Sequence, residues 1–205
     1  GSYNTAVGNQ AGSNITTGSN NICIGYNAQV PTPTADNQIR IGNTSITYAG
    51  VEVAWTITSD YRLKENISNS KLGLEFINKL RPVSYTRRND KTQKLELGFI
   101  AQEVEKALKE EQIENTGLVS IADDGTYSLR YNDFIAPIVK SIQELTTQNE
   151  ALKAANEQMK AQNEQMRAEN EQMRAENDEL KQRLERLEKY VFERTGSGDS
   201  NVGMK

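Results

Sequence analysis

Two side chains of this sequence, Ser59 and Lys64, have the types and the spacing that could cut a peptide bond. A serine hydroxyl attacks a carbonyl when a base removes its proton, and the neutral amine of a lysine is one such base. The chain contains no histidine, so a serine–histidine pair is excluded. A lysine amine ordinarily titrates near ~10.4, so burial or a nearby cation such as Arg62 has to favour its neutral form. The first candidate for chemistry is therefore a Ser–Lys dyad.

The reaction that such a dyad favours is an attack by the Ser59 hydroxyl on the carbonyl of the preceding residue, Thr58. An N→O acyl shift would form an ester, and hydrolysis of that ester would separate Thr58 from Ser59. A structural role is the alternative, because Ser59 followed by Asp60 is also a good cap for a helix or a turn. The spacing alone leaves both interpretations open.

A repetitive segment rich in Gly, Asn and Thr, residues 1–50, precedes the dyad. Three short runs, NTAVG, NICIG and QIRIG, end at Gly8, Gly25 and Gly42, which are 17 residues apart. β-favouring runs separated by turn residues predict stacked strands, here the end of a fibre shaft. One strand of this kind cannot bury its own apolar side, so it must stack on others. A flexible linker is the alternative, and the regular period disfavours it.

The composition excludes several classes of protein. The net charge is only −4 and both signs are mixed, which does not resemble the basic surface of a nucleic-acid-binding protein. The single cysteine, Cys23, can form no intrachain disulfide and is expected to face a core, and we expect no metal site and no cofactor. No apolar run is long enough to predict a membrane span. Hydrophobic residues are few (36%) and uneven, so burial is expected to come partly from other copies of the chain.

Residues 51–134 predict a small α+β domain. The alternation of Val51, Val53 and Trp55 with polar or small residues predicts a strand that leads into Ser59. Apolar periodicity predicts helices over residues 72–80 and 99–108. Strands are predicted over residues 83–87, 95–98, 119–121 and 127–129, with Asp123-Asp124-Gly125 as the turn between the last two.

Residues 135–192 predict a parallel coiled coil, because apolar residues recur at spacings of three and four. Leucines and methionines occupy heptad position d, and five consecutive a positions are asparagine: Asn149, Asn156, Asn163, Asn170 and Asn177. A buried asparagine needs an asparagine partner, so slipped registers are disfavoured. The near-tandem repeats also fit a low-complexity segment, but apolar d positions over about seven heptads favour the coiled coil.

Charges beside this seam fit a parallel arrangement. Glu169 and Glu176 occupy position g, and Arg174 and Lys181 occupy position e, five residues further along. Such pairs join neighbouring helices when these run parallel and in register. Asparagine at position a is best known from dimers, so the seam alone leaves dimer and trimer open.

Four motifs between residues 56 and 148 resemble, in order, those of the peptidase family S74 domain, the intramolecular chaperone of phage endosialidase tailspikes and other fibres. They are SDYRLKENI (59–67), LRPVSY (80–85), LGFIAQEV (97–104) and YNDFIAPI (131–138). The upstream repeats resemble those of phage tail fibres and trimeric surface adhesins. The resemblance implies a homotrimer that folds the upstream fibre segment and then releases itself. It implies Ser59 as the nucleophile, Lys64 as the base, and a cut between Thr58 and Ser59.

Other residues of these motifs receive no catalytic step. Asp60 and Arg62 match the opening signature, but spacing assigns them no role in the reaction. The remaining motif residues are expected to pack the domain, with the clearest cases being Gly98, Phe99, Val104 and Pro137.

The sequence thus predicts an elongated homotrimer of the α+β class. It would comprise a β-repeat shaft end (1–50), an S74-like chaperone domain (51–134), a coiled coil (135–192) and a flexible tail (193–205). Its partners would be its own copies and the upstream fibre segment, with no nucleic acid and no membrane span, in a virion tail fibre or on a bacterial cell surface. The main alternative is a fibre tip or adhesin module that trimerises without cutting. A coiled-coil scaffold or transcription factor is disfavoured because the chain lacks a basic DNA-reading region.

Overall fold

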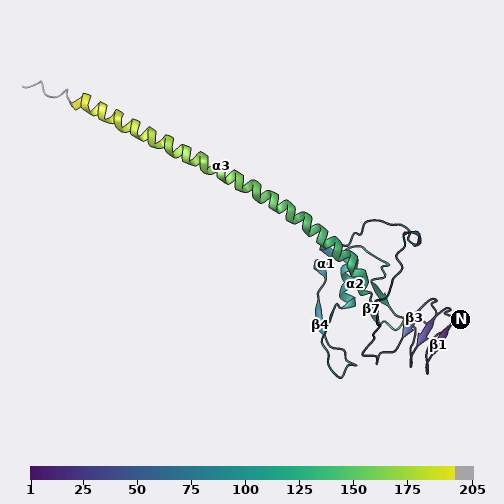
Figure 1. Ribbon diagram of the computed structural model, residues 1–205. Coiled ribbons are helices and arrows are strands. Elements are labelled where there is room, and N and C mark those ends of the chain that lie inside the picture. The colour runs from purple at the N-terminus through teal and green to yellow at the C-terminus, as the bar shows by residue number, and fades with distance from the viewer. Residues whose placement is uncertain (197–205) are drawn as a thin grey trace, which may run out of the picture. The chain divides into compact units, whose positions relative to one another are not determined.

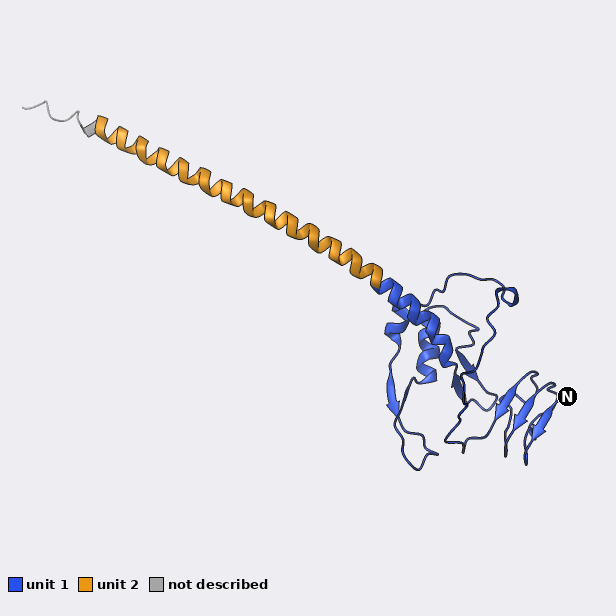
Figure 2. Cartoon of the chain, viewed as in Figure 1, with its two compact units in different colours: residues 1–145 blue, residues 146–205 orange. Residues whose placement is uncertain are grey.

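The computed structural model describes residues 1–196 and divides the chain into two units, residues 1–145 and the remainder (Figure 2). The first unit combines short strands and helices, and the second is helical (Figure 1). The α+β class with a long C-terminal helix is therefore confirmed. The flexible tail predicted over residues 193–205 lies, from residue 197 onward, outside the described residues.

The repeats form a parallel sheet in the order β1–β2–β3 (Figure 1). Its strands are β1 (Thr5–Val7), β2 (Ile22–Ile24) and β3 (Ile39–Ile41). Thr5 aligns with Ile22, and Ile22 aligns with Ile39, so each strand is shifted from the next by one repeat. The period read from the glycines is thus the pairing register of the sheet.

A ladder of amide side chains fixes this register. The backbone N–H of Asn21 donates to Asn4 Oδ1 (2.9 Å), and the backbone N–H of Gln38 donates to Asn21 Oδ1 (2.8 Å). Asn21 is completely buried, and its amide also donates to the carbonyl of Ala35 (3.1 Å). A register shift would leave these buried polar groups without partners, which is unfavourable.

The glycines that end the repeats are required by close backbone stacking. Gly8 and Gly25 adopt φ angles of +126° and +113°, which L side chains rarely adopt. A Cβ atom at Gly8 would lie 2.7 Å from the carbonyl oxygen of Gly25. Cys23 of β2 is buried in a small core with Ala28 and Val30, as predicted, and burial raises the pKa of its thiol.

The α+β part of the first unit follows the predicted order. Its elements are α1 (Leu74–Lys79), β4 (Val83–Tyr85), β5 (Glu96–Gly98), α2 (Ala101–Glu110), β6 (Val119–Ile121) and β7 (Tyr127–Leu129). β4 pairs with β5, and β6 pairs with β7, both antiparallel. Gly125 takes φ +81° in the second hairpin turn, as the Asp-Asp-Gly sequence predicts.

A single apolar core holds this part together. Phe76 of α1 is completely buried against α2, and the other buried members are Val104, Ala107, Leu108, Leu118 and Phe134. Lys79 of α1 also forms an ion pair with Glu111, just after α2. The core therefore joins segments from residue 76 to residue 134, so the motifs along this stretch fold as one body.

One predicted strand does not form. Residues 51–56, where Val51, Val53 and Trp55 alternate with polar or small residues, have no regular secondary structure and are exposed. A strand needs hydrogen-bonding partners on a neighbouring strand, and none of the described strands pairs with this segment. Its alternating pattern leaves a row of apolar side chains exposed next to the predicted cleavage site.

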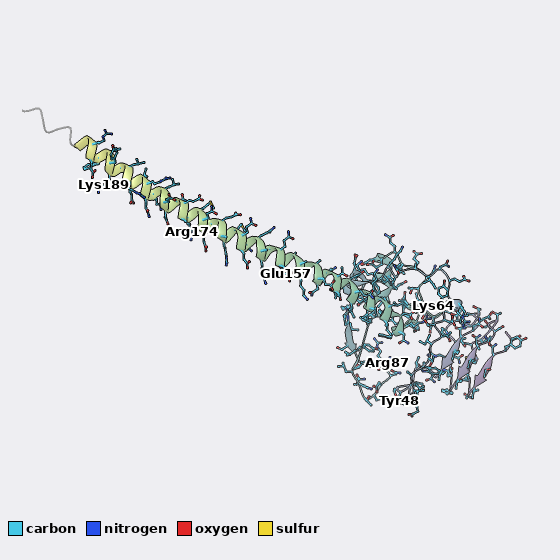
Figure 3. The ribbon with its side chains drawn as sticks, turned by 45° about the horizontal axis from the view of Figure 1, so that its top comes forward. Tyr48, Lys64, Arg87, Glu157, Arg174 and Lys189 are labelled. Atoms are coloured by element: carbon cyan, nitrogen blue, oxygen red, sulfur yellow. The ribbon has the colours of Figure 1, made fainter. Side chains whose placement is uncertain are left out.

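The long helix α3 (Ile135–Gly196) follows a short turn of 3₁₀ helix, η2 (Tyr131–Phe134). It contains 62 residues, and Pro137 lies in its first turn, where a missing N–H is tolerated. Beyond residue 145 every side chain described is exposed, including those of Glu157, Arg174 and Lys189 (Figure 3). The apolar d positions, from Leu152 to Leu187, are therefore uncovered in a single chain, and the coiled coil remains a prediction.

Candidate active site

The amine of Lys64 and the hydroxyl of Ser59 are in direct contact. Lys64 Nζ donates a hydrogen bond to Ser59 Oγ at 2.7 Å. An extended chain would separate residues five positions apart by roughly 17 Å, so a turn has to bring them together. That turn is η1 (Tyr61–Leu63), a 3₁₀ helix lying between the two residues. The two atoms are within the range in which a neutral amine could instead accept the hydroxyl proton.

Asp60 and Arg62 build this turn. The Asp60 carboxylate caps η1 by accepting the backbone N–H of Arg62 (2.9 Å), and it forms an ion pair with the Arg62 guanidinium (2.6 Å). The Arg62 side chain, followed by its backbone N–H, lowers the pKa of Asp60 below its ordinary value. The ion pair raises the pKa of Arg62. Sequence reasoning assigned these two residues no catalytic step and offered Ser59-Asp60 as a cap for a helix or a turn, and in the structure Asp60 is the cap of η1.

Apolar residues flank the dyad in the sequence, and their side chains are exposed. Trp55 and Ile57 precede it, and Tyr61 and Leu63 lie within the turn between its two members. All four are strongly exposed, as are Ser59 and Lys64 themselves. Several large apolar side chains left exposed in one segment suggest a surface that another protein covers.

Two side chains near the start of α3 hydrogen-bond to the backbone of the segment that follows the dyad, and we call these two contacts the grip. Lys140 Nζ donates to the carbonyl of Ser70 (2.6 Å), and Glu144 Oε2 accepts the backbone N–H of Leu74 at the start of α1 (2.7 Å). A Cβ atom at Gly73 would lie 2.6 Å from the Glu144 carboxylate, so a glycine makes room for this contact. Both interactions join residues 70 positions apart, and sequence reasoning missed them because no local pattern signals them.

The residues of α3 that contact the segment after the dyad lie on a different face of the helix from the apolar seam. Pro137 and Ser141 are buried on the face that carries Lys140 and Glu144. The seam residues of the same turns, Ile138, Ile142 and Leu145, are exposed on other sides of the helix. Contacts between copies through the seam would therefore leave the grip in place.

The later motifs meet in the body of the domain and not at the dyad. Arg81 of LRPVSY forms an ion pair with Glu103 of LGFIAQEV (2.5 Å). The Phe99 backbone N–H donates to the hydroxyl of Tyr131 (3.1 Å), and the Phe99 ring packs against Phe134 with centroids 5.1 Å apart. The packing role expected for Phe99 agrees with this geometry.

The described residues hold no group of three or more His, Cys, Asp or Glu side chains that could bind a metal ion. No helix among them is both long and apolar enough to cross a membrane.

The fold and the site together define a small α+β domain that opens on a hydroxyl–amine pair and continues into a long helix. Residues 59–113 match the family Peptidase_S74, the chaperone of endosialidase, which confirms the resemblance predicted from the motifs. The match begins at Ser59 and runs through α2, so it includes both members of the dyad and supports a chaperone role. No curated protein matches the chain.

Proposed function

We propose that the chain is an intramolecular trimerisation chaperone that releases itself from a fibre by cutting the bond between Thr58 and Ser59. The observation that carries this proposal is the 2.7 Å contact between Lys64 Nζ and Ser59 Oγ, at the first residue of the match to the S74 chaperone family. The repeat sheet ends before this contact and the chaperone fold begins after it. A cut here would separate the two functional parts of the chain.

The cut proceeds in two balanced steps. The neutral Lys64 amine takes the proton of the Ser59 hydroxyl as Oγ attacks the carbonyl carbon of Thr58. The C–N bond then breaks, Lys64 returns the proton to the departing nitrogen, and Thr58 is held as an ester on Ser59. Water hydrolyses the ester, which gives a carboxylate on Thr58 and leaves Ser59 with a free amine and its hydroxyl.

Assembly supplies what the single chain lacks. A lysine acts as a base where water is largely excluded from its amine. Ser59 and Lys64 are exposed in one chain, and so are the neighbouring side chains of Trp55 and Tyr61. Neighbouring copies that pack on these aromatic side chains would cover the dyad. Cutting then follows correct assembly, and the released shaft is trapped kinetically because its chaperone has gone.

The wider setting follows from the repeats. A stacked parallel sheet with an exposed apolar outer side, including Ile24, Ile39 and Ile41, fits a shaft built from three copies. We place it in a phage tail fibre, a tailspike or a bacterial surface adhesin. The upstream part of the same chain is the client of the chaperone.

Intact mass under denaturing conditions tests the proposal. We expect the purified chain to give two fragments, residues 1–58 and 59–205, and Ser59→Ala and Lys64→Ala to give one uncut chain. Denaturation is needed because contacts across the cut, such as the hydrogen bond from Asp123 N–H to the carbonyl of Pro31 (3.1 Å), can hold the fragments together.

Matched controls come from the same segment. Ser68→Ala and Lys71→Ala remove an exposed hydroxyl and an exposed amine of neighbouring residues and should cut normally. A single uncut mass for the unaltered chain, although it is trimeric in solution, would instead establish the non-cleaving fibre tip.

A further inference from the structure

The apolar seam of α3 is not uniform along its length. Between residues 149 and 177 every a position is asparagine and only the d positions are apolar. At the C-terminal end both positions are apolar, with Leu184 and Val191 at a and Leu180 and Leu187 at d. All four side chains are more than half exposed in the single chain. We call residues 176–191 the C-terminal clasp.

The charged residues at positions e and g beside the seam also change along the helix. In the first heptads the basic e positions Lys153, Lys160 and Arg167 have no acidic g residue five positions before them, and the first attractive pair is Glu169 with Arg174, at the end of the asparagine section. In the clasp Glu176 precedes Lys181, and Arg183 precedes Glu188, each by five residues. The second pair has the opposite polarity to the first. A neighbouring copy meets attractive charges at both places only when it is parallel and in register.

The clasp is therefore complementary to itself. Arg183 lies 4.0 Å from Glu179 of its own helix, a weak exposed pair that costs little to break when the guanidinium pairs with a neighbouring copy. In the asparagine section, the Asn170 side chain donates to the carbonyl of Met166 in its own helix (2.9 Å). That bond has to break when the Asn170 side chain turns towards a neighbouring helix. Pairing therefore stabilises the asparagine section less than it stabilises the clasp.

We infer that the C-terminal clasp is where copies of this chain first associate, and that pairing then spreads through the asparagine section towards the chaperone domain. The occupant of the clasp surface is the same segment of another copy. This inference rests on the proposed trimerising function and adds the site at which assembly begins. Apolar contacts drive the first encounter, and the asparagine layers then reject slipped registers.

A matched pair of variants in the full chain tests this order. Leu187→Asn and Leu152→Asn make the same change at position d of the same helix, and both leucines are about equally exposed, at 61% and 65%. Assembly after dilution from denaturant is followed by helical circular dichroism at several protein concentrations. We expect Leu187→Asn to slow association by about tenfold or more. Leu152→Asn should leave the association rate nearly unchanged and accelerate dissociation.

A charge exchange tests the pairing in the clasp. Arg183→Glu and Glu188→Arg should each weaken association, because each places like charges together, and the double variant should restore it. Equal slowing by Leu187→Asn and Leu152→Asn, or no rescue in the double variant, would overturn the inference. A monomeric unaltered chain in sedimentation velocity would instead contradict the trimerising function itself.

Discussion

At the scale of single residues, the dyad depends on a turn that only a few side chains maintain. Asp60 caps η1 and holds Arg62, and the turn brings Ser59 and Lys64 into contact. The proposed nucleophile and its proposed base are thus held together by a local turn, even though both side chains are exposed. What a single chain does not provide is the exclusion of water.

Removing the cap should separate the dyad. We expect Asp60→Ala to slow cutting on the order of 10²-fold, since misplacing reacting groups by about 1 Å has effects of that size. Asp60→Asn keeps an acceptor for the Arg62 N–H and should slow cutting less. The measurement is the time course of fragment appearance by intact mass. Equal rates for Asp60→Ala and the unaltered chain would show that the turn does not position the dyad.

Asp60 should not shape the pH profile near neutrality. Hydrogen bonds from Arg62 lower the pKa of Asp60. A carboxyl group with a lowered pKa contributes stability above its ordinary pKa, and that contribution is lost only as the pH falls through the lowered value. We therefore expect Asp60→Asn and the unaltered chain to show cutting rates with parallel pH dependence from about pH 6 to 9, a range above the ordinary carboxyl pKa. Profiles of different shape would contradict this assignment.

At the scale of elements, helix α3 connects the predicted seam to the segment after the dyad. Its first turns carry Lys140 and Glu144 on one face and the seam residues on others. Glu144 places a carboxylate at the N-terminus of α1, where exposed N–H groups favour an acceptor and a negative charge.

Loss of this cap should destabilise the domain. We expect Glu144→Ala to lower the free energy of unfolding by about 1 kcal/mol, a typical value for a lost N-terminal cap. Glu144→Gln should lower it by less, because an oxygen acceptor remains. Denaturant unfolding at a fixed protein concentration measures the difference, with Glu150→Ala, an exposed glutamate further along α3, as the control. A change equal to that of the control would show that the contact contributes nothing.

The elements that the sequence predicted are those with local signals. α1, α2 and the hairpin β6–β7 were predicted within a few residues, because apolar periodicity and turn residues lie within each element. The strand predicted over residues 51–56 was wrong for the single chain, since a strand depends on a partner that the segment does not have here. The S74 motif named Ser59 and Lys64 together, and their contact forms because a turn over five residues is local, while their catalytic roles stay a prediction. The grip by Glu144 could not be predicted, because it joins distant residues.

At the scale of the whole chain, some apolar side chains are buried within one copy, and others could be buried only by contact with further copies. The domain core and the small core around Cys23 form within one chain. The α3 seam and the apolar residues next to the dyad stay exposed. The homotrimer therefore remains a proposal that rests on the exposed surfaces and on the family match.

The repeat sheet should tolerate the loss of one whole period. Deleting residues 9–25 removes 17 residues and leaves Asn4 and Gln38 one period apart, so the amide ladder can re-form. Deleting residues 10–25 removes 16 and shifts the register. We expect hydrogen exchange to show a protected amide at Gly42, which donates to the preceding strand, after the first deletion and loss of that protection after the second. Similar exchange in both variants would show that the ladder does not set the register.

The ladder of Asn4, Asn21 and Gln38 has a consequence for how such a shaft can evolve. Its repeating unit is a stretch of 17 codons, and a duplication or loss of that unit by unequal recombination keeps the spacing that the amide ladder requires. Each added unit would lengthen the repeat sheet by about 4.8 Å, the spacing of neighbouring strands. The sheet can thus change length in steps of one repeat without any change to the domain that begins at Ser59.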